Sequence, residues 1–390
     1  MSEENNMNEV RYGIIGFGHQ GSYYADILNK SGKEYSSRVT AICDIDPLKR
    51  EEAKKLYPEV EIFTNHKALI DSGLVDAVLI ETPHYFHPEI AIYALKHHTH
   101  VLSDKPIGVF CKNVIEALEE SKKHPELLFG TFFNQRTNPL YIKAKELINS
   151  DEFGQLTRLS WIITDWYRTQ AYYDNGSWRG SFKGEGGGVL LNQCPHQIDL
   201  LAYFCGLPKK VTATIKTVGR NITVENDVTA ILEYDNMVAT FITSTHDTPG
   251  TNRLEFTGTG GKIVIEDNTI KFYKNAIKED VFAVENKEFM SKPEVKEIIY
   301  SLEDEDTEEM RKLKINFGNA QPQHLMIIKR FSEVLLGKEK KLFATGEDGL
   351  NELILSNAMH LSGWLNKTVT LPLDNDLFLK LLQERIDKEN

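Results

Sequence analysis

Two side chains in this sequence, Lys105 and His196, have the chemistry needed to move a proton to or from a hydroxyl group. Lys105 follows Asp104 in a loop directly after an apolar run, and His196 lies in a glycine-rich stretch that begins at Gly186. An imidazole can act as a general base, and an ammonium group can stabilise negative charge that develops on oxygen. A solvated loop lysine and a buried structural histidine are the plain alternatives, and a neutral Lys105 would share the role of base.

The residues around His196 have a helical spacing. Asn192, His196 and Asp199 stand at positions i, i+4 and i+7, so a helix over this stretch would place all three on one face. Pro195 would bend such a helix, and the glycines at 186–188 allow a cofactor or backbone to approach closely. We therefore expect one polar stripe that faces a pocket.

A glycine-rich turn, Gly16-Phe17-Gly18-His19-Gln20-Gly21, stands between an expected strand, Val10 to Ile15, and an expected helix, Ser22 to Asn29. In this context the glycines permit a tight turn, and the helix N-terminus attracts a pyrophosphate. Asp44 follows Gly21 by 23 residues, where an acidic residue would accept hydrogen bonds from ribose hydroxyls. A carboxylate there would repel a 2′-phosphate, so the motif favours NAD over NADP. It does not by itself exclude FAD or a turn that binds nothing.

The elements that must position these residues fall into two domains. Residues 9–132 alternate short apolar runs with amphipathic segments, which is typical of βαβ units and predicts a Rossmann domain with a parallel sheet. Residues 133–390 contain long runs with period-two alternation, which predict an α/β domain with a large, mostly antiparallel open sheet. The expected strands of this sheet lie at 156–164, 210–217, 228–234, 237–245, 253–257 and 262–266.

Composition narrows the class of protein. The 390 residues carry a formal charge of -12, which argues against a nucleic-acid or anionic membrane partner. The four cysteines form no CxxC pair, and no signal peptide or membrane span is evident, so we expect a cytoplasmic protein. His97, His98 and His100 are interpreted as surface histidines, no metal is expected, and the acidic run 303–306 is interpreted as a solvated loop.

Several motifs together resemble the Gfo/Idh/MocA family of glucose-fructose oxidoreductases and inositol dehydrogenases. They are the turn 16–21, Thr82-Pro83, His87, Asp104-Lys105-Pro106, Trp178-Arg179-Gly180 and the run 186–200. The resemblance implies an NAD(P)-dependent oxidoreductase for sugars, polyols or their derivatives, in which Lys105 and His196 flank the reacting hydroxyl. It also implies a homodimer or homotetramer formed through the open sheet. The family often has aspartate where this chain has Asn192, whose amide can donate and accept hydrogen bonds but cannot hold a negative charge or relay a proton.

The remaining candidate residues are assigned to cofactor or substrate. Residues expected to contact the cofactor lie in the turn or at strand ends that face one crevice: Gly16, Phe17, Gly18, His19, Gln20, Gly21, Asp44, Thr82, His87, Asp104 and Lys105. Aromatic rings and charged donors suit a carbohydrate, so a second set is expected to contact substrate: Arg136, Asp165, Tyr167, Arg168, Tyr173, Trp178, Arg179 and Asn192. Core tyrosines and surface arginines are the alternative interpretation of the second set.

Two other functions remain open at this point. One is a glycosidase in which NAD oxidises the substrate transiently, so that elimination follows without net redox change. The other is a non-catalytic NAD-binding sensor. Accumulation of NADH would distinguish a dehydrogenase from the glycosidase, and the presence of both Lys105 and His196 argues against the sensor.

Overall fold

The computed structural model describes residues 8–176, 178–301 and 322–389. Contacts within the chain divide it into two units: Met1–Asn134 with Asn319–Leu353, and Gln135–Gly318 with Ile354–Asn390. The expected division placed everything after 132 in the second domain, whereas residues from the C-terminal third of the chain return to the first unit. The acidic run 303–306 lies outside the described residues.

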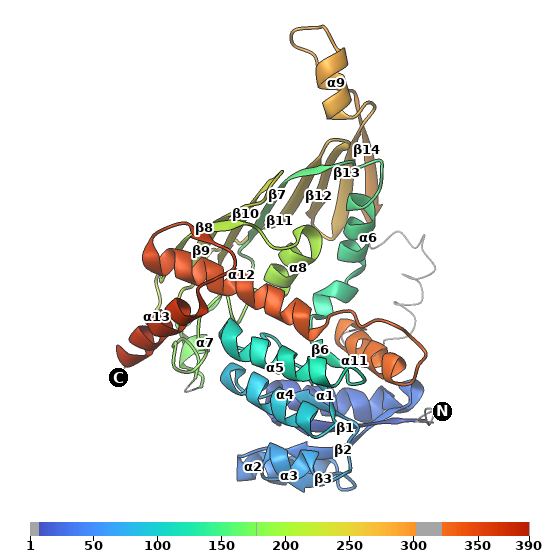
Figure 1. Ribbon diagram of the computed structural model, residues 1–390, viewed down its shortest axis with the longest axis vertical. Coiled ribbons are helices and arrows are strands. Elements are labelled where there is room, and N and C mark those ends of the chain that lie inside the picture. The colour runs from blue at the N-terminus through green and yellow to red at the C-terminus, as the bar shows by residue number, and fades with distance from the viewer. Residues whose placement is uncertain (1–7, 177, 302–321, 390) are drawn as a thin grey trace. The chain divides into compact units, whose positions relative to one another are not determined.

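The first unit contains a six-stranded sheet in the order β3-β2-β1-β4-β5-β6 (Figure 1). Every strand pairing in this sheet is parallel. The order reverses between β1 and β4, and ligands of open parallel sheets bind beyond the carboxyl ends of the strands at such a point. The expected Rossmann sheet is confirmed, with strands β1 (Val10–Ile15), β2 (Ser37–Cys43), β3 (Glu61–Phe63), β4 (Ala77–Ile80), β5 (His100–Ser103) and β6 (Phe129–Thr131).

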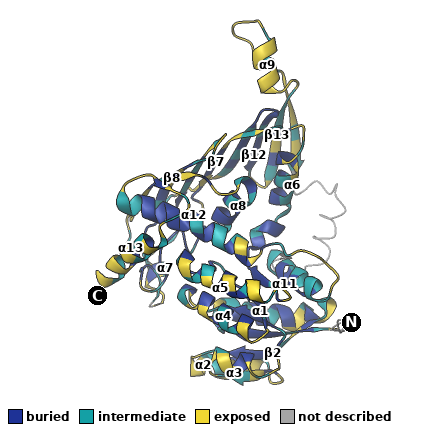
Figure 2. Ribbon diagram, viewed as in Figure 1, coloured by how far each residue is buried: buried dark blue, intermediate teal, exposed yellow. Residues whose placement is uncertain are grey.

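The helices around this sheet carry exposed residues on the side drawn in Figure 2. All four residues of β4 are buried. Full burial explains why β4 is apolar throughout and does not alternate. Asp46 caps α2 by accepting a hydrogen bond from the Leu48 backbone N–H at 2.8 Å, and Pro47 occupies the first helical position. The helical segments are α1 (His19–Ser31), η1 (Gly32–Tyr35), α2 (Pro47–Leu56), α3 (His66–Ile70), η2 (His84–Phe86), α4 (His87–Lys96), α5 (Cys111–Lys123) and α11 (Pro322–Leu335).

Helix α11 is joined to the Rossmann sheet by buried hydroxyl groups. The Ser332 Oγ atom lies 2.7 Å from the Tyr12 hydroxyl on β1 and 2.8 Å from the Ser37 Oγ on β2. All three residues are almost fully buried. Buried hydroxyls need such partners, so the returning helix satisfies polar atoms in the sheet itself.

The second unit contains a nine-stranded sheet in the order β14-β13-β12-β11-β7-β10-β9-β8-β15 (Figure 1). Strands β7 and β10 run parallel to each other, and the other pairings are antiparallel. This confirms the expected mostly antiparallel sheet. Its strands are β7 (Leu156–Ile163), β8 (Lys210–Lys216), β9 (Asp227–Glu233), β10 (Val238–Ser244), β11 (Asn252–Gly258), β12 (Gly261–Glu266), β13 (Thr269–Asn275), β14 (Val295–Ser301) and β15 (Val369–Thr370).

Alternate residues of this sheet pack under helices. On β7, Trp161 is buried and its ring lies 6.0 Å from that of Tyr141 on α6, while Phe204 on α8 packs 4.9 Å from Phe256 on β11. The opposite face exposes apolar side chains, including Ile162 and Ile231. The helical segments are η3 (Asn134–Thr137), α6 (Pro139–Ile148), α7 (Gln170–Asp174), α8 (Pro195–Cys205), α9 (Glu279–Glu285), α12 (Gly346–Leu365, which begins in the first unit) and α13 (Asn375–Asp387).

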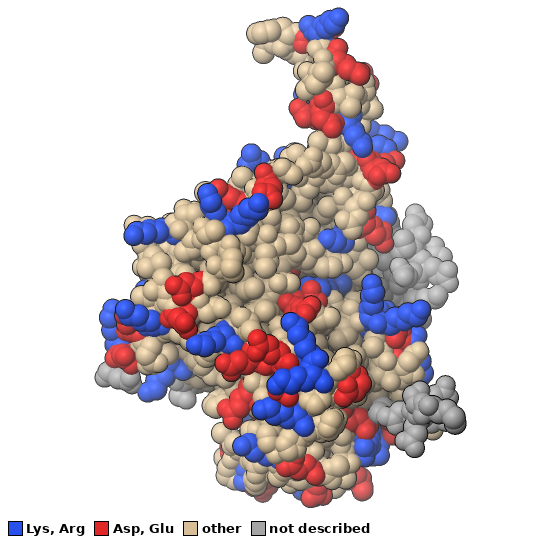
Figure 3. Space-filling view, in the orientation of Figure 1, with Lys and Arg blue, Asp and Glu red and all other residues tan. Residues whose placement is uncertain are grey.

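The surface mixes both signs of charge. On the face drawn in Figure 3, Lys and Arg side chains are interspersed with Asp and Glu. Among the helices that the structure describes, none has the length and apolar character to cross a bilayer.

Candidate active site

The glycine-rich turn follows β1 and leads into α1. Gly16 has a φ of 99°, and a Cβ there would lie 2.6 Å from the Glu81 carbonyl oxygen; a Cβ on Gly21 would overlap the Gly16 carbonyl oxygen. The chain itself therefore requires these two glycines. A Cβ on Gly18 would meet nothing within 4 Å, and α1 starts there without a side-chain cap. Open space at uncapped helix N–H groups fits the pyrophosphate of a dinucleotide.

Asp44 lies directly after β2 and is joined to this turn. Its Oδ2 accepts a hydrogen bond from the Phe17 backbone N–H at 2.7 Å, and its Oδ1 accepts one from the Asp46 backbone N–H at 2.8 Å. Each carboxylate oxygen can accept a further hydrogen bond, so ribose hydroxyls fit beside it. Lys49 pairs with Glu52 at 2.7 Å, so its charge is already matched. This arrangement supports a preference for NAD.

Lys105 lies just beyond β5, beside two carboxyl groups. The Asp104 backbone N–H donates to the Ile80 carbonyl oxygen at 2.9 Å, which ties the loop after β5 to the end of β4. Glu81 is the first residue after β4, and burial together with the nearby Asp104 raises the pKa of its carboxyl well above the usual value. Glu81 therefore holds its proton more tightly than an ordinary glutamate does. We did not predict it, although a glutamate directly after a fully apolar strand is a signal for this position.

A neutral histidine from α11 completes the polar surroundings of Lys105. His324 Nδ1 lies 3.0 Å from the Tyr24 hydroxyl, and Asn134 Nδ2 donates to His324 Nε2 at 2.9 Å. Burial, opposed by Asp104 and helped by the nearby Lys105, lowers the pKa of His324 to about 4. An acceptor Nε2 leaves the proton on Nδ1, facing Tyr24. Sequence reasoning missed His324 because only the fold brings α11 to this site.

The His87 ring contacts the loop after β4 and the loop after β5. It is 1% exposed, with Nδ1 2.8 Å from the Pro106 carbonyl oxygen and Nε2 2.6 Å from the Thr82 carbonyl oxygen. Burial lowers its pKa, and the two backbone carbonyls that face the ring nitrogens oppose part of that shift. The expected contact between the His87 side chain and the cofactor is thereby corrected, because both ring nitrogens face backbone carbonyls.

His196 is the second residue of α8, and the predicted helix around it was wrong in its start. The helix begins at Pro195, because proline lacks an N–H and is tolerated only in the first turn. Asn192 therefore lies in the preceding turn, where its backbone N–H donates to the Gly188 carbonyl oxygen at 2.9 Å. Asn192 and His196 are half-buried, whereas Asp199 is completely buried. The expected stripe of three polar residues is reduced to two.

Asp199 instead holds Arg136, which was expected to contact substrate. Arg136 Nε donates to Asp199 Oδ2 at 2.8 Å and Nη2 donates to Oδ1 at 2.7 Å. The side chains are 6% and 0% exposed, and the guanidinium also lies 4.7 Å from the Tyr203 ring centroid. This buried pair fixes α8 against the segment before α6, so the expected substrate role of Arg136 is corrected to a structural one.

Removing Arg136 should therefore destabilise the protein. Arg136→Met leaves the Asp199 carboxylate buried without its main partner, and we expect the free energy of unfolding to fall by about 3–5 kcal/mol. Urea denaturation followed by circular dichroism measures this. The matched control is Arg38→Met, which removes an exposed pair with Glu9 and should cost about 0–1 kcal/mol. Equal losses in the two variants would contradict the structural role.

The other expected substrate residues divide into two groups. Tyr173 is buried, and its hydroxyl lies 2.8 Å from the Thr245 Oγ1, so it is a core residue rather than a substrate contact. Tyr167 is 46% exposed, Asp165 is exposed, and Trp178 is half-buried. Arg179 stacks over the Trp178 ring at 4.6 Å. The second group retains surface that a substrate can reach.

A buried glutamate, Glu225, holds the glycine-rich run in place. Glu225 Oε1 accepts hydrogen bonds from the backbone N–H groups of Gly188 and Leu190 at 2.8 and 3.1 Å. His360 Nε2 lies 3.0 Å from the other Glu225 oxygen. A Cβ on Gly188 would overlap the Glu225 carbonyl oxygen, so this glycine serves close approach of backbone. Glu225 and His360 were not predicted as part of the site.

Two family models match the chain. Residues 10–131 match the oxidoreductase family with an NAD-binding Rossmann fold, and residues 141–264 match the GFO/IDH/MocA C-terminal domain. Together they cover more than half of the sequence. The chain belongs to the GFO/IDH/MocA family. The resemblance drawn from the motifs is confirmed, as are the Rossmann fold and its NAD-binding character.

Named relatives of this family member differ in activity. It is 26% identical to 2,7-anhydro-N-acetylneuraminate hydratase of Escherichia coli over 55% of this chain and 53% of that protein. It is 27% identical to myo-inositol 2-dehydrogenase of Thermotoga maritima over 50% of this chain and 55% of that protein. The chain thus spans little more than half the length of these curated relatives.

The fold of this chain also matches those of solved structures. One is the WlbA dehydrogenase of Bordetella pertussis in complex with NADH and UDP-GlcNAcA. The match covers 94% of this chain and 100% of that one, with a TM-score of 0.74 and 21% sequence identity. At this identity the similarity establishes the shared fold.

Asn192, which stands where the family often has aspartate, contacts a carboxyl group from another position. Asn192 Nδ2 donates to Glu185 Oε1, and the Gly180 backbone N–H donates to Glu185 Oε2 at 2.7 Å. Burial raises the pKa of Glu185 to about 7, against the opposing effect of these hydrogen bonds. A titratable carboxyl therefore lies beside Asn192, and sequence reasoning missed it.

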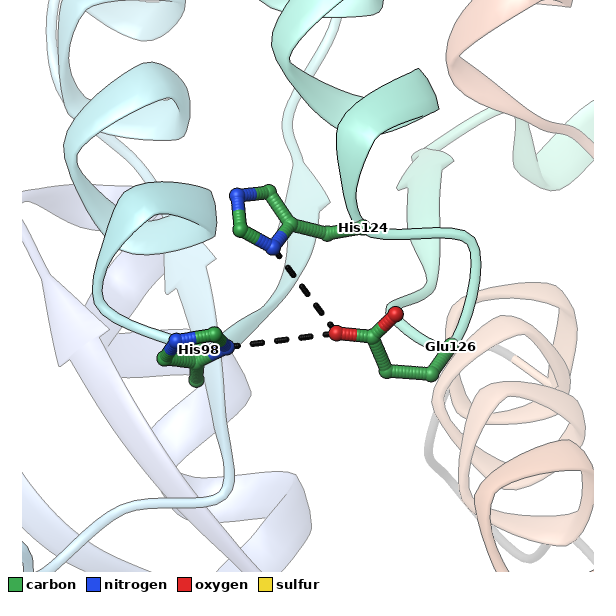
Figure 4. Close-up of side chains that lie close together, drawn as sticks. All are labelled: His98, His124 and Glu126. Atoms are coloured by element: carbon green, nitrogen blue, oxygen red, sulfur yellow. Dashed lines mark ion pairs between the residues drawn. The ribbon is translucent and has the colours of Figure 1, made fainter.

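The histidines near the end of α4 do not gather as one group. His97 Nδ1 pairs with Asp71 at 2.7 Å, and burial lowers the pKa of His100 to about 4. His98 instead lies near His124 and Glu126 (Figure 4). The Nδ1 atoms of these two histidines lie 3.9 and 3.8 Å from the Glu126 Oε1. Ligands around tetrahedral zinc lie closer, at about 3.3 Å, given Zn–N bonds of about 2.0–2.1 Å. Each histidine would pair with Glu126 when protonated, and His124 is the most buried of the three.

Proposed function

We propose that this protein is an NAD-dependent oxidoreductase that moves a hydride between a secondary alcohol of a sugar, polyol or glycoside and nicotinamide. The observation that carries the proposal is the placement of Lys105 beyond β5, at the edge of the sheet where the glycine turn and Asp44 provide a dinucleotide site. The named dehydrogenases among its relatives support the same reaction class.

Each residue has one task in this proposal. Bound NAD would accept the hydride. The Lys105 ammonium orients the substrate hydroxyl and stabilises negative charge on its oxygen, and the His196 imidazole accepts the proton. Asn192 donates to and accepts from a neighbouring hydroxyl, because an amide can do both. Asp104, Thr82, Tyr167, Arg168 and Trp178 remain candidate contacts to cofactor or substrate.

The proposal is tested by a substrate screen. Purified protein is mixed with NAD and a panel of sugars, inositols and glycosides, and NADH is followed at its absorption band. Formation of NADH with a stoichiometric ketone product supports the proposal. An enzyme that binds NADH yet reduces or oxidises no member of the panel in either direction contradicts it.

The choice of cofactor depends on Asp44. Asp44→Ala removes a charged acceptor for ribose hydroxyls, so NAD should bind about ten- to a hundredfold more weakly, as for loss of a charged hydrogen bond. Because the carboxylate no longer repels a 2′-phosphate, NADP should improve relative to NAD. Fluorescence titration with NADH and NADPH measures both constants. Asp44→Asn, which retains an acceptor without the charge, should show the NADP effect with a smaller loss of NADH; an unchanged ratio in both variants would remove Asp44 from the ribose site.

A redox-neutral reaction is the second candidate, favoured by the relative named as a hydratase. In such a reaction, bound NAD would take the hydride from the alcohol and return it after water or an alkoxy group had been eliminated or added, so that no net redox change would occur. Product formation with catalytic NAD and no accumulated NADH would identify it. Lys105 and His196 keep their roles in both reactions.

Cytoplasmic location and assembly stay predictions. The face of the sheet that exposes Ile162, Ile231 and Ile299 is the surface we propose for a homodimer or homotetramer. Sedimentation velocity measures the assembly, and charged substitutions at Ile162 and Ile231 are the variants that test the face.

A further inference from the structure

Three arginines lie together in the second unit. The guanidinium groups of Arg179 and Arg168 lie 4.6 and 5.0 Å from the centroid of the Tyr172 ring. Arg220 Nε donates to the Arg168 carbonyl oxygen at 2.8 Å, and its guanidinium lies 5.2 Å from the Tyr167 ring centroid. All three arginines are partly exposed. We call them the arginine cluster.

The arginine cluster has no carboxylate partner among the described residues. The arginine ion pairs within that part of the chain belong to other residues, namely Arg11, Arg38, Arg136, Arg253 and Arg330. Glu185 is close enough for Arg179 to lower its pKa, but burial outweighs that effect and raises the pKa to about 7. Glu185 therefore offsets at most part of one of three positive charges near neutral pH.

Some N–H donors of the arginine cluster have no acceptor among the described residues. Arg179 donates from Nη1 to the Tyr172 hydroxyl at 2.5 Å, and Arg168 donates from Nη1 to the Trp166 and Tyr167 carbonyl oxygens at 3.3 and 3.1 Å. The buried Nε of Arg168 and Nη2 of Arg220 have no acceptor among the residues that the structure describes. Stacking on an aromatic ring occupies the face of a guanidinium and leaves its N–H edge for a planar acceptor.

The cluster is connected to the proposed catalytic segment. The Tyr172 hydroxyl, which accepts from Arg179, donates to Asn192 Oδ1 at 3.4 Å, and Gln193 Nε2 donates to the same hydroxyl at 3.1 Å. Asn192 lies four residues before His196. A group held by the arginines would thus lie beside the segment that carries the proposed base.

We propose that the arginine cluster binds an oxyanion on the substrate, so that the enzyme acts on an acidic sugar carrying a carboxylate or phosphate. Both groups present oxygen pairs that match the N–H edge of a guanidinium. An oxyanion would satisfy the open donors and neutralise charges that otherwise repel one another. This inference rests on the proposed function for the reaction, but binding of the acidic group can be measured without turnover.

The test uses the full chain loaded with NAD. Calorimetry measures binding of D-glucuronate, D-glucose 6-phosphate, D-glucose and inorganic phosphate, each at millimolar concentration, and kcat and KM are measured for the three sugars. We expect one or both acidic sugars to bind more tightly than glucose, with inorganic phosphate as a competitor. Arg179→Met should weaken binding of the acidic sugars about ten- to a hundredfold and weaken binding of glucose much less. Arg179→Lys, which keeps the charge, should recover part of the loss.

The outcomes separate the inference from the proposed function. Tight binding of an acidic sugar without NADH formation supports the cluster and counts against the redox proposal. Oxidation of glucose with the same kcat/KM as both acidic sugars supports the redox proposal and overturns the inference. Failure of all three anions to bind also overturns it, as does an equal loss in Arg38→Met, which removes one exposed charge in the first unit. The acidic sugar that binds more tightly shows whether the substrate's acidic group is a carboxylate or a phosphate.

Discussion

Replacement of Lys105 by Met should lower kcat about 10²–10³-fold, the usual cost of removing one group that stabilises an oxyanion. Methionine has a similar length and no charge, so it fills the same space beyond β5 without the ammonium. Lys105 is half-buried beside Glu81 and Asp104, so its charge acts where water screens it poorly. Stopped-flow measurement of hydride transfer with a substrate found in the screen gives the change in the chemical step.

Two control measurements show whether the loss of kcat is specific to the Lys105 ammonium group. NADH binding by fluorescence should persist in Lys105→Met, because Asp44 and the glycine turn are unchanged. Lys122→Met, which removes an exposed lysine from α5, should retain the wild-type kcat. A Lys105→Met enzyme with normal kcat would show that another group polarises the alcohol.

The second large effect is expected at His196. His196→Asn removes a general base, and kcat should fall about 10²–10⁴-fold. The asparagine keeps a polar side chain near the start of α8, while the Arg136–Asp199 pair continues to hold the helix. The free energy of unfolding should therefore stay close to that of the wild type.

The pH profile distinguishes a catalytic from a structural role for His196. A base must be unprotonated to accept the substrate proton, so kcat/KM of the wild type should fall on the acid side. In His196→Asn that fall should be lost or moved. His98→Asn, at an exposed histidine in the first unit, is the control and should keep the wild-type profile. An unchanged profile in His196→Asn would count against its role as base.

Local patterns predicted the elements that are long and strongly patterned. The strand Val10–Ile15 has the expected bounds because it is a buried apolar run. Short polar elements such as β3 (Glu61–Phe63) and α3 (His66–Ile70) were not predicted, since three to five residues carry little periodicity. The helix expected from Asn192 began later because Pro195 sets its first turn.

The sequence predicted the positions of candidate site residues that lie directly after a strand. The glycine turn and Asp44 are joined by a hydrogen bond, and Lys105 follows a parallel strand, as the spacing indicated. The errors concern residues whose partners are distant in sequence. Arg136 and Tyr173 have side chains that suit a sugar. Only the fold shows that Arg136 is hydrogen-bonded to Asp199 and Tyr173 to Thr245. The same reason explains why His324 and Glu185 were overlooked.

The hydrogen bonds between α11 and the Rossmann sheet limit where the chain can be divided into stable fragments. Cutting the polypeptide after Asn134 would strip Tyr12 and Ser37 of their partner and remove His324 from Tyr24. A nucleotide-binding fragment that ends at Asn134 would therefore have buried polar groups without partners and part of its core exposed. Chimaeras that exchange coenzyme modules between relatives need to transplant two separate stretches, 8–134 and 322–353, as one cassette.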